Sequence, residues 1–320
     1  MKHLSFIVFI FLLAATASAQ GQTPRTAEEY NNRGFERQNS GDLDGAITDY
    51  DKALAMKAKP AVLLAAYNNR ANARMRKNDF DGAIADYGKA IEIEPENFEN
   101  YFNRGVVRSA KGDDESAIAD FTKAIELAPQ FAVAYNNRGN ARRARGDVEG
   151  AIADYNKAVE TNPRYAEAYY NRGIALQSKE DPESAIRDYS TALELAPQFT
   201  DALVNRGQAK QTKHDLAGAI ADYNAALQLK SDDASIYFAR ATALQAKKDF
   251  PGALADYSKT IELDPTSSRA YANRGAVRLL QHHDAEADQD FAKAFKLEPG
   301  LKAEFEKFIV ATKRARGTNQ

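Results

Sequence analysis

The sequence predicts an all-α protein built as a linear array of helical repeats. A phrase close to Tyr-x-Asn-Arg-Gly returns eight times, and twelve residues after its Gly position each copy is followed by Ala-x-x-Asp and an aromatic residue. The Arg of the phrase stands at Arg33, Arg70, Arg104, Arg138, Arg172, Arg206, Arg240 and Arg274, so the first interval is 37 residues and the other six are 34. A fixed period of this length indicates stacked supersecondary units, each too small to bury its own apolar face.

The first nineteen residues differ from the rest of the chain. A charged start at Lys2 is followed by an apolar run from Leu4 to Leu13 and by the small-residue site Ala17-Ser18-Ala19. This order is typical of a secretory signal peptide, and the run is shorter than the ~20 residues that span a bilayer. We expect cleavage after Ala19 and a periplasmic or secreted protein, with an uncleaved N-terminal anchor as the alternative.

Each repeat reads as two helices joined by a short turn. In 132–165, apolar or small residues at helical spacing are followed by a break at Gly146-Asp147, and a second helical pattern ends at Asn162-Pro163. Gly139 in the first helix is small enough to let the two backbones approach closely. Tyr155 in the second helix is large enough to fill the space between them.

The expected organisation follows from this period. We assign 1–19 to the signal peptide, 20–26 to a linker and 27–301 to the array, followed by a capping helix and tail over 302–320. The repeats are expected at 27–63, 64–97, 98–131, 132–165, 166–199, 200–233, 234–267 and 268–301. Leu301 to Arg314 carries Phe305, Phe308 and Ile309 on one side, as a helix that covers the open end of an array would.

The repeat resembles the tetratricopeptide repeat (TPR) family, in an exported bacterial form. The resemblance covers residues 27 to 301 and rests on an aromatic, a Gly, an Ala, a second aromatic and a closing Pro at fixed offsets. The Ala, for example, is present in all eight repeats, at Ala46, Ala83, Ala117, Ala151, Ala185, Ala219, Ala253 and Ala287. It implies a right-handed α-solenoid of eight helix-turn-helix units with a C-terminal capping helix, and a role in binding other proteins.

One ladder of asparagines precedes the repeated Arg: Asn32, Asn69, Asn103, Asn137, Asn171, Asn205 and Asn273. The resemblance implies that this position faces the concave groove, where a similar Asn row in O-GlcNAc transferase clamps the backbone of an extended peptide. A primary amide suits that task because it offers both a donor and an acceptor. The alternative is that these amides bridge or cap neighbouring helices. Three aromatic residues, Phe102, Tyr170 and Phe238, are expected either to form side-chain pockets in the same groove or to pack against the adjacent repeat.

The repeated Arg is matched in every repeat by an Asp: Asp49, Asp86, Asp120, Asp154, Asp188, Asp222, Asp256 and Asp290. Because the two ladders correspond one to one, we favour an ion pair within the fold over a row of Arg side chains that binds acidic ligands.

Composition argues against catalysis, cofactors and nucleic acid. The 43 Lys and Arg residues nearly balance the 45 Asp and Glu residues, so no basic surface for nucleic acid is expected. The chain has no Cys, and only His214, His282 and His283 remain after signal removal, too few for the usual metal or nucleophile sites. We expect no cofactor, no metal site, no enzymatic activity and no membrane span after cleavage.

The sequence therefore predicts a non-catalytic scaffold or adaptor of the cell envelope that binds other proteins or extended peptides. Two alternatives are a self-associating structural component of an envelope assembly and a regulatory subunit of an envelope protease or cell-wall enzyme.

Overall fold

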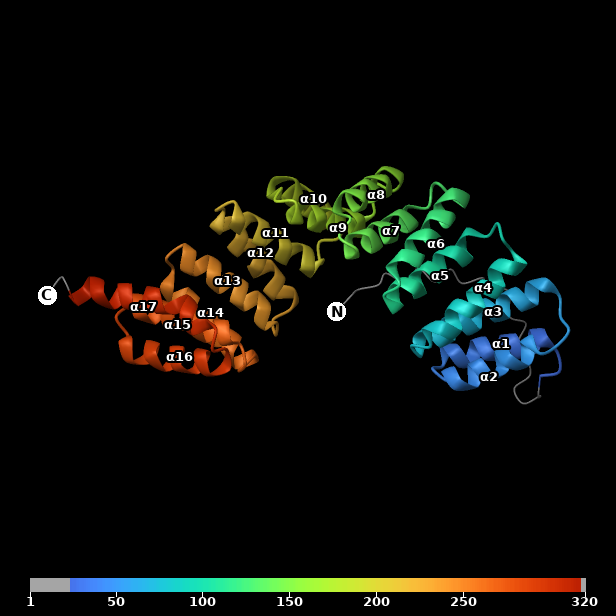
Figure 1. Ribbon diagram of the computed structural model, residues 1–320, viewed down its shortest axis with the longest axis horizontal. Helices are drawn as coiled ribbons and strands as arrows, with labels where there is room; N and C mark the ends of the chain where they lie inside the picture. Colours follow the sequence, from blue (N-terminus) through green and yellow to red (C-terminus); the bar gives the residue numbers. More distant parts are fainter. Residues whose placement is uncertain (1–23, 318–320) are drawn as a thin grey trace. The chain divides into compact units, whose positions relative to one another are not determined.

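The computed structural model describes residues 24–317, which form seventeen α-helices and no strand (Figure 1). The predicted signal peptide 1–19, the first four residues of the linker 20–26 and the last three residues of the predicted tail lie outside the described residues. The helices are α1 (Ala27–Asn39), α2 (Leu43–Leu54), α3 (Pro60–Arg76), α4 (Phe80–Ile93), α5 (Phe98–Lys111), α6 (Asp114–Leu127), α7 (Ala132–Ala144), α8 (Val148–Thr161), α9 (Ala166–Ser178), α10 (Pro182–Leu195), α11 (Thr200–Thr212), α12 (Leu216–Leu229), α13 (Ala234–Ala246), α14 (Phe250–Leu263), α15 (Ser268–Leu280), α16 (Asp284–Leu297) and α17 (Leu301–Gly317).

The chain divides into two compact units between Gly112 and Asp113. The N-terminal unit holds α1 to α5, and the C-terminal unit holds α6 to α17. The division falls in the turn of the third expected repeat. Within each unit, every helix packs on the helices before and after it, which is the arrangement of a solenoid.

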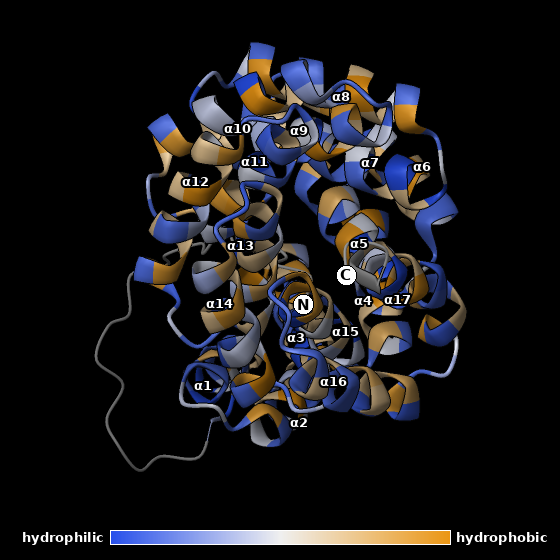
Figure 2. Ribbon diagram, turned by 90° about the vertical axis from the view of Figure 1, so that its left-hand side faces the viewer, coloured by the Kyte–Doolittle hydropathy of each residue, from blue (hydrophilic) through white to orange (hydrophobic). Residues whose placement is uncertain are grey.

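Odd-numbered and even-numbered helices have different neighbours. Successive odd-numbered helices also contact one another, as α1 with α3 in the N-terminal unit and α7 with α9, α9 with α11, and α11 with α13 in the C-terminal unit. We call the side of each unit that these helices form the A-helix face. In Figure 2, individual helices carry both hydrophobic and hydrophilic residues, as expected for helices that pack on one side and meet solvent on another.

Aspartate and a left-handed residue set the turn within most repeats. The N-cap of seven of the eight even-numbered helices is an Asp, whose side chain accepts a hydrogen bond from the backbone N–H three residues later: Asp42, Asp79, Asp113, Asp147, Asp181, Asp215 and Asp249. The residue before the cap has a positive φ in all eight repeats, and glycine occupies this position only at Gly41, Gly112 and Gly146. In the last repeat, His282 takes the left-handed position and His283 the N-cap.

The interior of each repeat is a small residue packed against an aromatic ring. A Cβ atom added to Gly139 would lie 2.7 Å from Cε1 of Tyr155, so only glycine fits there without moving the ring. Tyr155 is fully buried, as are its counterparts in the neighbouring repeats. The size pattern predicted from the sequence is therefore confirmed.

The three extra residues in the first interval lengthen a helix. α3 begins at Pro60, in the N1 position that proline favours, and runs for 17 residues. Residues 60–63 therefore form the first turn of α3, and the boundary that we placed after residue 63 falls inside that helix. At the other end, α17 packs on α15 and α16, with Phe305, Phe308 and Ile309 against a buried cluster that includes Leu279 and Phe291, which confirms the expected capping helix.

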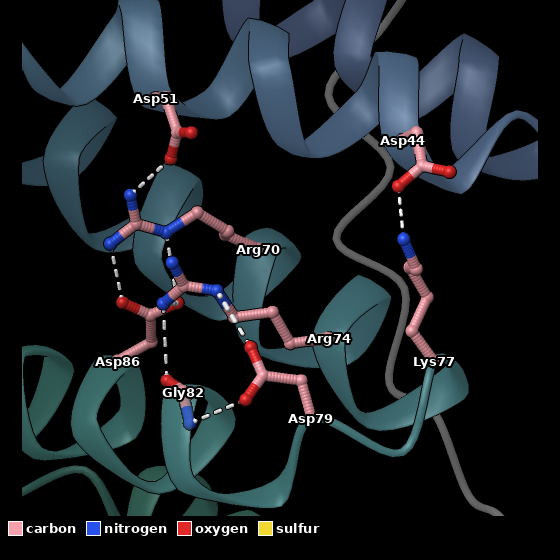
Figure 3. Close-up of polar contacts among 8 residues, drawn as sticks. All are labelled: Asp44, Asp51, Arg70, Arg74, Lys77, Asp79, Gly82 and Asp86. Atoms are coloured by element: carbon pink, nitrogen blue, oxygen red, sulfur yellow. Dashed lines mark hydrogen bonds and ion pairs between the residues drawn. The ribbon is translucent and has the colours of Figure 1, made fainter.

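A two-bond contact between an Arg and an Asp, which we call a fork, joins the two helices of a repeat. In seven repeats, Nε and Nη2 of the ladder Arg donate to Oδ2 and Oδ1 of the Asp sixteen residues later. Around Asp86, for example, the Arg70 distances are 2.9 and 2.5 Å, and Arg74 donates to the same carboxylate at 2.7 Å (Figure 3). The Asp side chains are almost entirely buried. The ion-pair interpretation of the two ladders is confirmed in these repeats.

The same guanidinium also reaches the preceding repeat. Nη1 of Arg70 donates to Asp51 on α2 at 2.5 Å (Figure 3). Likewise, Nη1 of Arg138 donates to Thr122 on α6 at 3.0 Å. Each such Arg therefore joins three helices, its own, the next one and the previous even-numbered helix. The ring of the Tyr three residues before it, Tyr67 for Arg70 and Tyr135 for Arg138, lies 5.7 Å from the guanidinium carbon.

Removing one fork should destabilise the C-terminal unit strongly. Asp154→Asn leaves Arg138 and Arg142 without their shared carboxylate, and breaking a buried pair from one side costs about 3–5 kcal/mol of unfolding free energy. Lys179→Ala, which removes the exposed bridge to Glu149, is the matched control and should cost under about 1 kcal/mol. Urea unfolding followed by circular dichroism measures both, and equal losses would contradict the role of the fork.

The buried tyrosines should make the protein sensitive to alkali. Burial raises the pKa of Tyr50, Tyr189 and Tyr223 above the ordinary tyrosine value, whereas unfolded tyrosines ionise near about pH 10. The folded state therefore keeps these protons to a higher pH than the unfolded state does. The stability that the tyrosines contribute is complete below about pH 10 and decreases as the pH rises above it. Urea midpoints at about pH 8 and about pH 11 should show this decrease, and Tyr223→Phe should reduce it. A midpoint that does not change over this range would refute the linkage.

Candidate functional site

The asparagine ladder lies on the A-helix faces of the two units. Asn32, Asn69 and Asn103 belong to the N-terminal unit, and Asn137, Asn171, Asn205 and Asn273 belong to the C-terminal unit. Asn32 is exposed, and the other six are half-buried. The structure therefore brings the predicted residues together as two separate sets, each on odd-numbered helices.

Several of these amides bridge neighbouring odd-numbered helices. Nδ2 of Asn171 donates to Oδ1 of Asn136 at 2.9 Å, and Nδ2 of Asn205 donates to the Tyr170 hydroxyl at 3.1 Å. In the N-terminal unit, Nδ2 of Asn69 donates to Asn31 at 3.1 Å. The bridging that we considered as an alternative thus occurs at these three positions.

Two other amides of the ladder do not bridge odd-numbered helices. Nδ2 of Asn137 donates to the Val133 carbonyl at 2.8 Å, one turn back in α7. Asn273 lies near the Tyr257 hydroxyl and lowers its pKa against the rise that burial causes, and that hydroxyl donates to Gln245. A bond through one N–H fixes an amide and still leaves its second N–H, so bridging and ligand binding are compatible uses of the same side chain.

The three predicted aromatics pack inside the repeats. Phe102 is 5% exposed. The Tyr170 ring lies 4.5 Å from the Phe199 ring and 5.9 Å from that of Tyr189, and Phe238 lies 5.8 Å from Tyr257, all between centroids. These contacts match the packing alternative better than open pockets. Burial raises the pKa of Tyr170 to about 12, so its hydroxyl is neutral near pH 7 and accepts the bond from Asn205.

One residue of the A-helix face departs from the repeat pattern in a way that our sequence reasoning missed. Four residues after the conserved small position, this chain has Gln38, Gln177, Gln211 and Gln245, each of which accepts a hydrogen bond from the buried Tyr hydroxyl of its repeat. The fourth repeat has Arg143 at this position. The signal was present in the sequence as a charge at a position otherwise taken by uncharged residues.

Arg143 has no carboxylate partner within residues 24–317, whereas its neighbours do. Arg142 pairs with Asp154 at 2.8 Å, and Arg145 pairs with Glu115 at 2.9 Å. Arg143 is half-buried, lies near the Tyr155 hydroxyl, whose pKa it lowers, and has a buried Nε that meets no acceptor.

The described residues of the C-terminal unit also form a depression. An open depression of about 450 Å³ is lined by Ala166, Glu167, Ala196, Pro197, Gln198 and Phe199, at the start of α9 and α11. Across residues 24–317, no group of three or more His, Cys, Asp or Glu side chains is placed to hold a metal ion. Among the helices that the structure describes, none is long and apolar enough to cross a membrane.

Solved structures with similar folds are TPR proteins. YrrB, described as a TPR protein with an unusual peptide-binding site, is 25% identical, with a TM-score of 0.52 over 57% of this chain and 95% of that one. A TPR protein from Parabacteroides merdae is 21% identical, with a TM-score of 0.56 over 78% of this chain and 99% of that one. Pseudomonas aeruginosa pilF is 17% identical, with a TM-score of 0.57 over 64% and 94%. The last two similarities concern the fold alone.

No match was found among curated protein sequences. Family models give a direct assignment. Models described as TPR repeat match residues 71–112 and 139–180, and models described as tetratricopeptide repeat match 98–131, 166–199 and 204–268. These matches cover more than half of the chain and agree with the helix pairs described above. The chain belongs to the tetratricopeptide repeat family, whose fold is typically a non-catalytic scaffold for protein–protein interaction.

Proposed function

We propose that this protein is an adaptor that binds extended segments of other proteins on its A-helix face. The observation that carries the proposal is the set of half-buried amides on successive odd-numbered helices of the C-terminal unit, Asn137, Asn171 and Asn205. Their bonds to Val133, Asn136 and Tyr170 hold the amides in place before a ligand arrives. A preorganised side chain loses little entropy when it binds.

Amides in this arrangement suit a peptide backbone. Adjacent helices lie about 8–10 Å apart, and an extended chain rises about 3.3 Å per residue, so each repeat would meet about three ligand residues. Each hydrogen bond contributes only about 0.5–1.5 kcal/mol, so useful affinity requires several repeats acting together. This favours an adaptor with several partners of moderate affinity. YrrB, whose name records a peptide-binding site, supports the choice of a peptide ligand.

We place the adaptor in the bacterial cell envelope, as a periplasmic or secreted protein. The support for this location is the sequence of residues 1–19, with its charged start, apolar run and Ala17-Ser18-Ala19 site.

The binding surface is tested by capture of partners from an envelope extract. The parent chain is compared with a variant that combines Asn137→Ala, Asn171→Ala and Asn205→Ala, and with a control of three exposed substitutions on even-numbered helices, Lys157→Ala, Glu194→Ala and Gln228→Ala. Circular dichroism checks that all three chains remain helical. We expect the Asn variant to lose the proteins that the parent and the control both retain, by about tenfold or more if it loses two to three hydrogen bonds.

If the Asn variant retains the same partners as the parent, the A-helix face is not the binding surface. Sedimentation of the parent over a range of concentrations then tests the structural alternative, because a self-associating assembly component increases in mass with concentration.

The location is tested by expressing the full chain in a Gram-negative host. We expect the chain in the periplasmic fraction to begin at Gln20 by mass spectrometry, and deletion of residues 2–19 to keep it in the cytoplasm. An intact N-terminus on membrane-bound protein would instead identify residues 1–19 as an anchor.

A further inference from the structure

Arg143 is not required to complete the interior of its repeat. In the repeats that carry Gln at this position, the Gln side chain accepts the hydrogen bond of the buried Tyr hydroxyl. In the fourth repeat, Asn140 takes over that bond, because the Tyr155 hydroxyl donates to its Oδ1 at 2.8 Å. The second repeat has the same arrangement: the Tyr87 hydroxyl donates to Asn72, and Met75 stands at the position of Arg143. The packing of this repeat therefore does not require the charge of Arg143.

The surroundings of Arg143 supply hydroxyl groups but no negative charge. The hydroxyls of Tyr155, Tyr170 and Tyr189 are close enough for the guanidinium to lower their pKa, against the rise that burial causes. A half-buried guanidinium without a carboxylate has lost part of its hydration and gained no counter-charge. Such a group binds an anion more strongly than an exposed arginine does.

The repeated arginines of this chain show which group a guanidinium binds in this fold. Each presents Nε and Nη2 to the two oxygens of one carboxylate, as Arg138 does to Asp154 at 3.0 and 2.7 Å. Nε of Arg143 belongs to the same edge of the group and has no acceptor. It is covered in the free chain, so we expect the side chain to turn when a carboxylate binds.

Arg143 also belongs to a helix that carries one of the proposed ligand-binding amides. It lies on α7 together with Asn137, and α7 packs on α9, which carries Asn171. A peptide held by these two amides would pass the same helix pair from which Arg143 extends.

We propose that Arg143 binds a carboxylate of the extended peptide and so selects ligands with an acidic group at one position. The carboxylate comes from an Asp or Glu side chain or from the C-terminus of the ligand. The inference rests on the proposed function and adds to it the chemical class of the ligand.

The test is a selection of short random peptides for binding to the chain with all seventeen described helices. The peptides are displayed with either a blocked or a free C-terminus. Three forms are compared: the parent, Arg143→Gln, and the control Arg145→Gln. Arg143→Gln restores the residue that three later repeats carry, so it should fold with an unchanged unfolding midpoint. Arg145→Gln removes the same charge two residues away, from an exposed bridge to Glu115.

We expect the parent and Arg145→Gln to select peptides with Asp or Glu at one position, or peptides with a free C-terminus. Replacing that Glu by Gln, or amidating that C-terminus, should weaken binding to these two forms about tenfold, which corresponds to one charge-assisted contact. Arg143→Gln should bind the charged and neutral peptides with affinities equal to within about twofold, a difference well under 1.4 kcal/mol.

Two results would overturn the inference and leave the proposed function intact. The first is selection of binders without an acidic preference on the parent. The second is an acidic preference that persists in Arg143→Gln. Failure to select any binder on any form would count against both the inference and the peptide-binding function, and the capture experiment then shows whether folded partners bind elsewhere.

Discussion

The buried arginine–aspartate fork is the interaction on which the rest of the structure depends. A carboxylate such as Asp154 has almost no contact with water, so its charge is tolerable only because Arg138 and Arg142 both donate to it. In return, the carboxylate fixes the direction of the Arg138 guanidinium. That direction places Nη1 against Thr122 of the preceding helix and the guanidinium over the Tyr135 ring. Pairing within one repeat and stacking on the previous one are therefore set by the same side chain.

This arrangement separates the residues that build the fold from those available for binding. The forks, the buried tyrosines and their small partners lie between paired helices, and most of the polar interior is satisfied there. The A-helix face carries amides such as Asn171 that are fixed by a single bond and remain half-buried. Arg143 follows the same division, since Asn140 supplies the bond that the fold requires. Under the proposed function, variation on this face changes the ligand while the forks stay intact.

Much of the fold could be predicted from the sequence because one pattern is repeated eight times. Period, turn residues and the pairing of Arg with Asp are all local, and each copy confirms the others. The start of α3 could not be predicted reliably, because proline both ends helices and begins them, and Pro60 does the latter. The site was predictable only in outline. Whether Asn205 reaches Tyr170 depends on how α9 and α11 stack. The sequence shows the unusual charge of Arg143, but its lack of a carboxylate partner is found only when its side-chain contacts are compared with those of Gln177.

The reach of the guanidinium into the previous repeat has a consequence for how such a chain can grow. Arg172 and Arg206 use the same sixteen-residue offset backward, to Asn156 and Ser190, that they use forward to their own Asp. Each of these periods thus contains one cation and one carboxylate, and the period before it supplies one polar acceptor. A gene duplication that inserts one whole period introduces its own partners and leaves no buried charge unmatched. The length of the array is thereby free to drift during evolution in steps of 34 residues, the interval of the repeated Arg, whereas residues inserted between an Arg and its Asp would change the sixteen-residue offset of a fork.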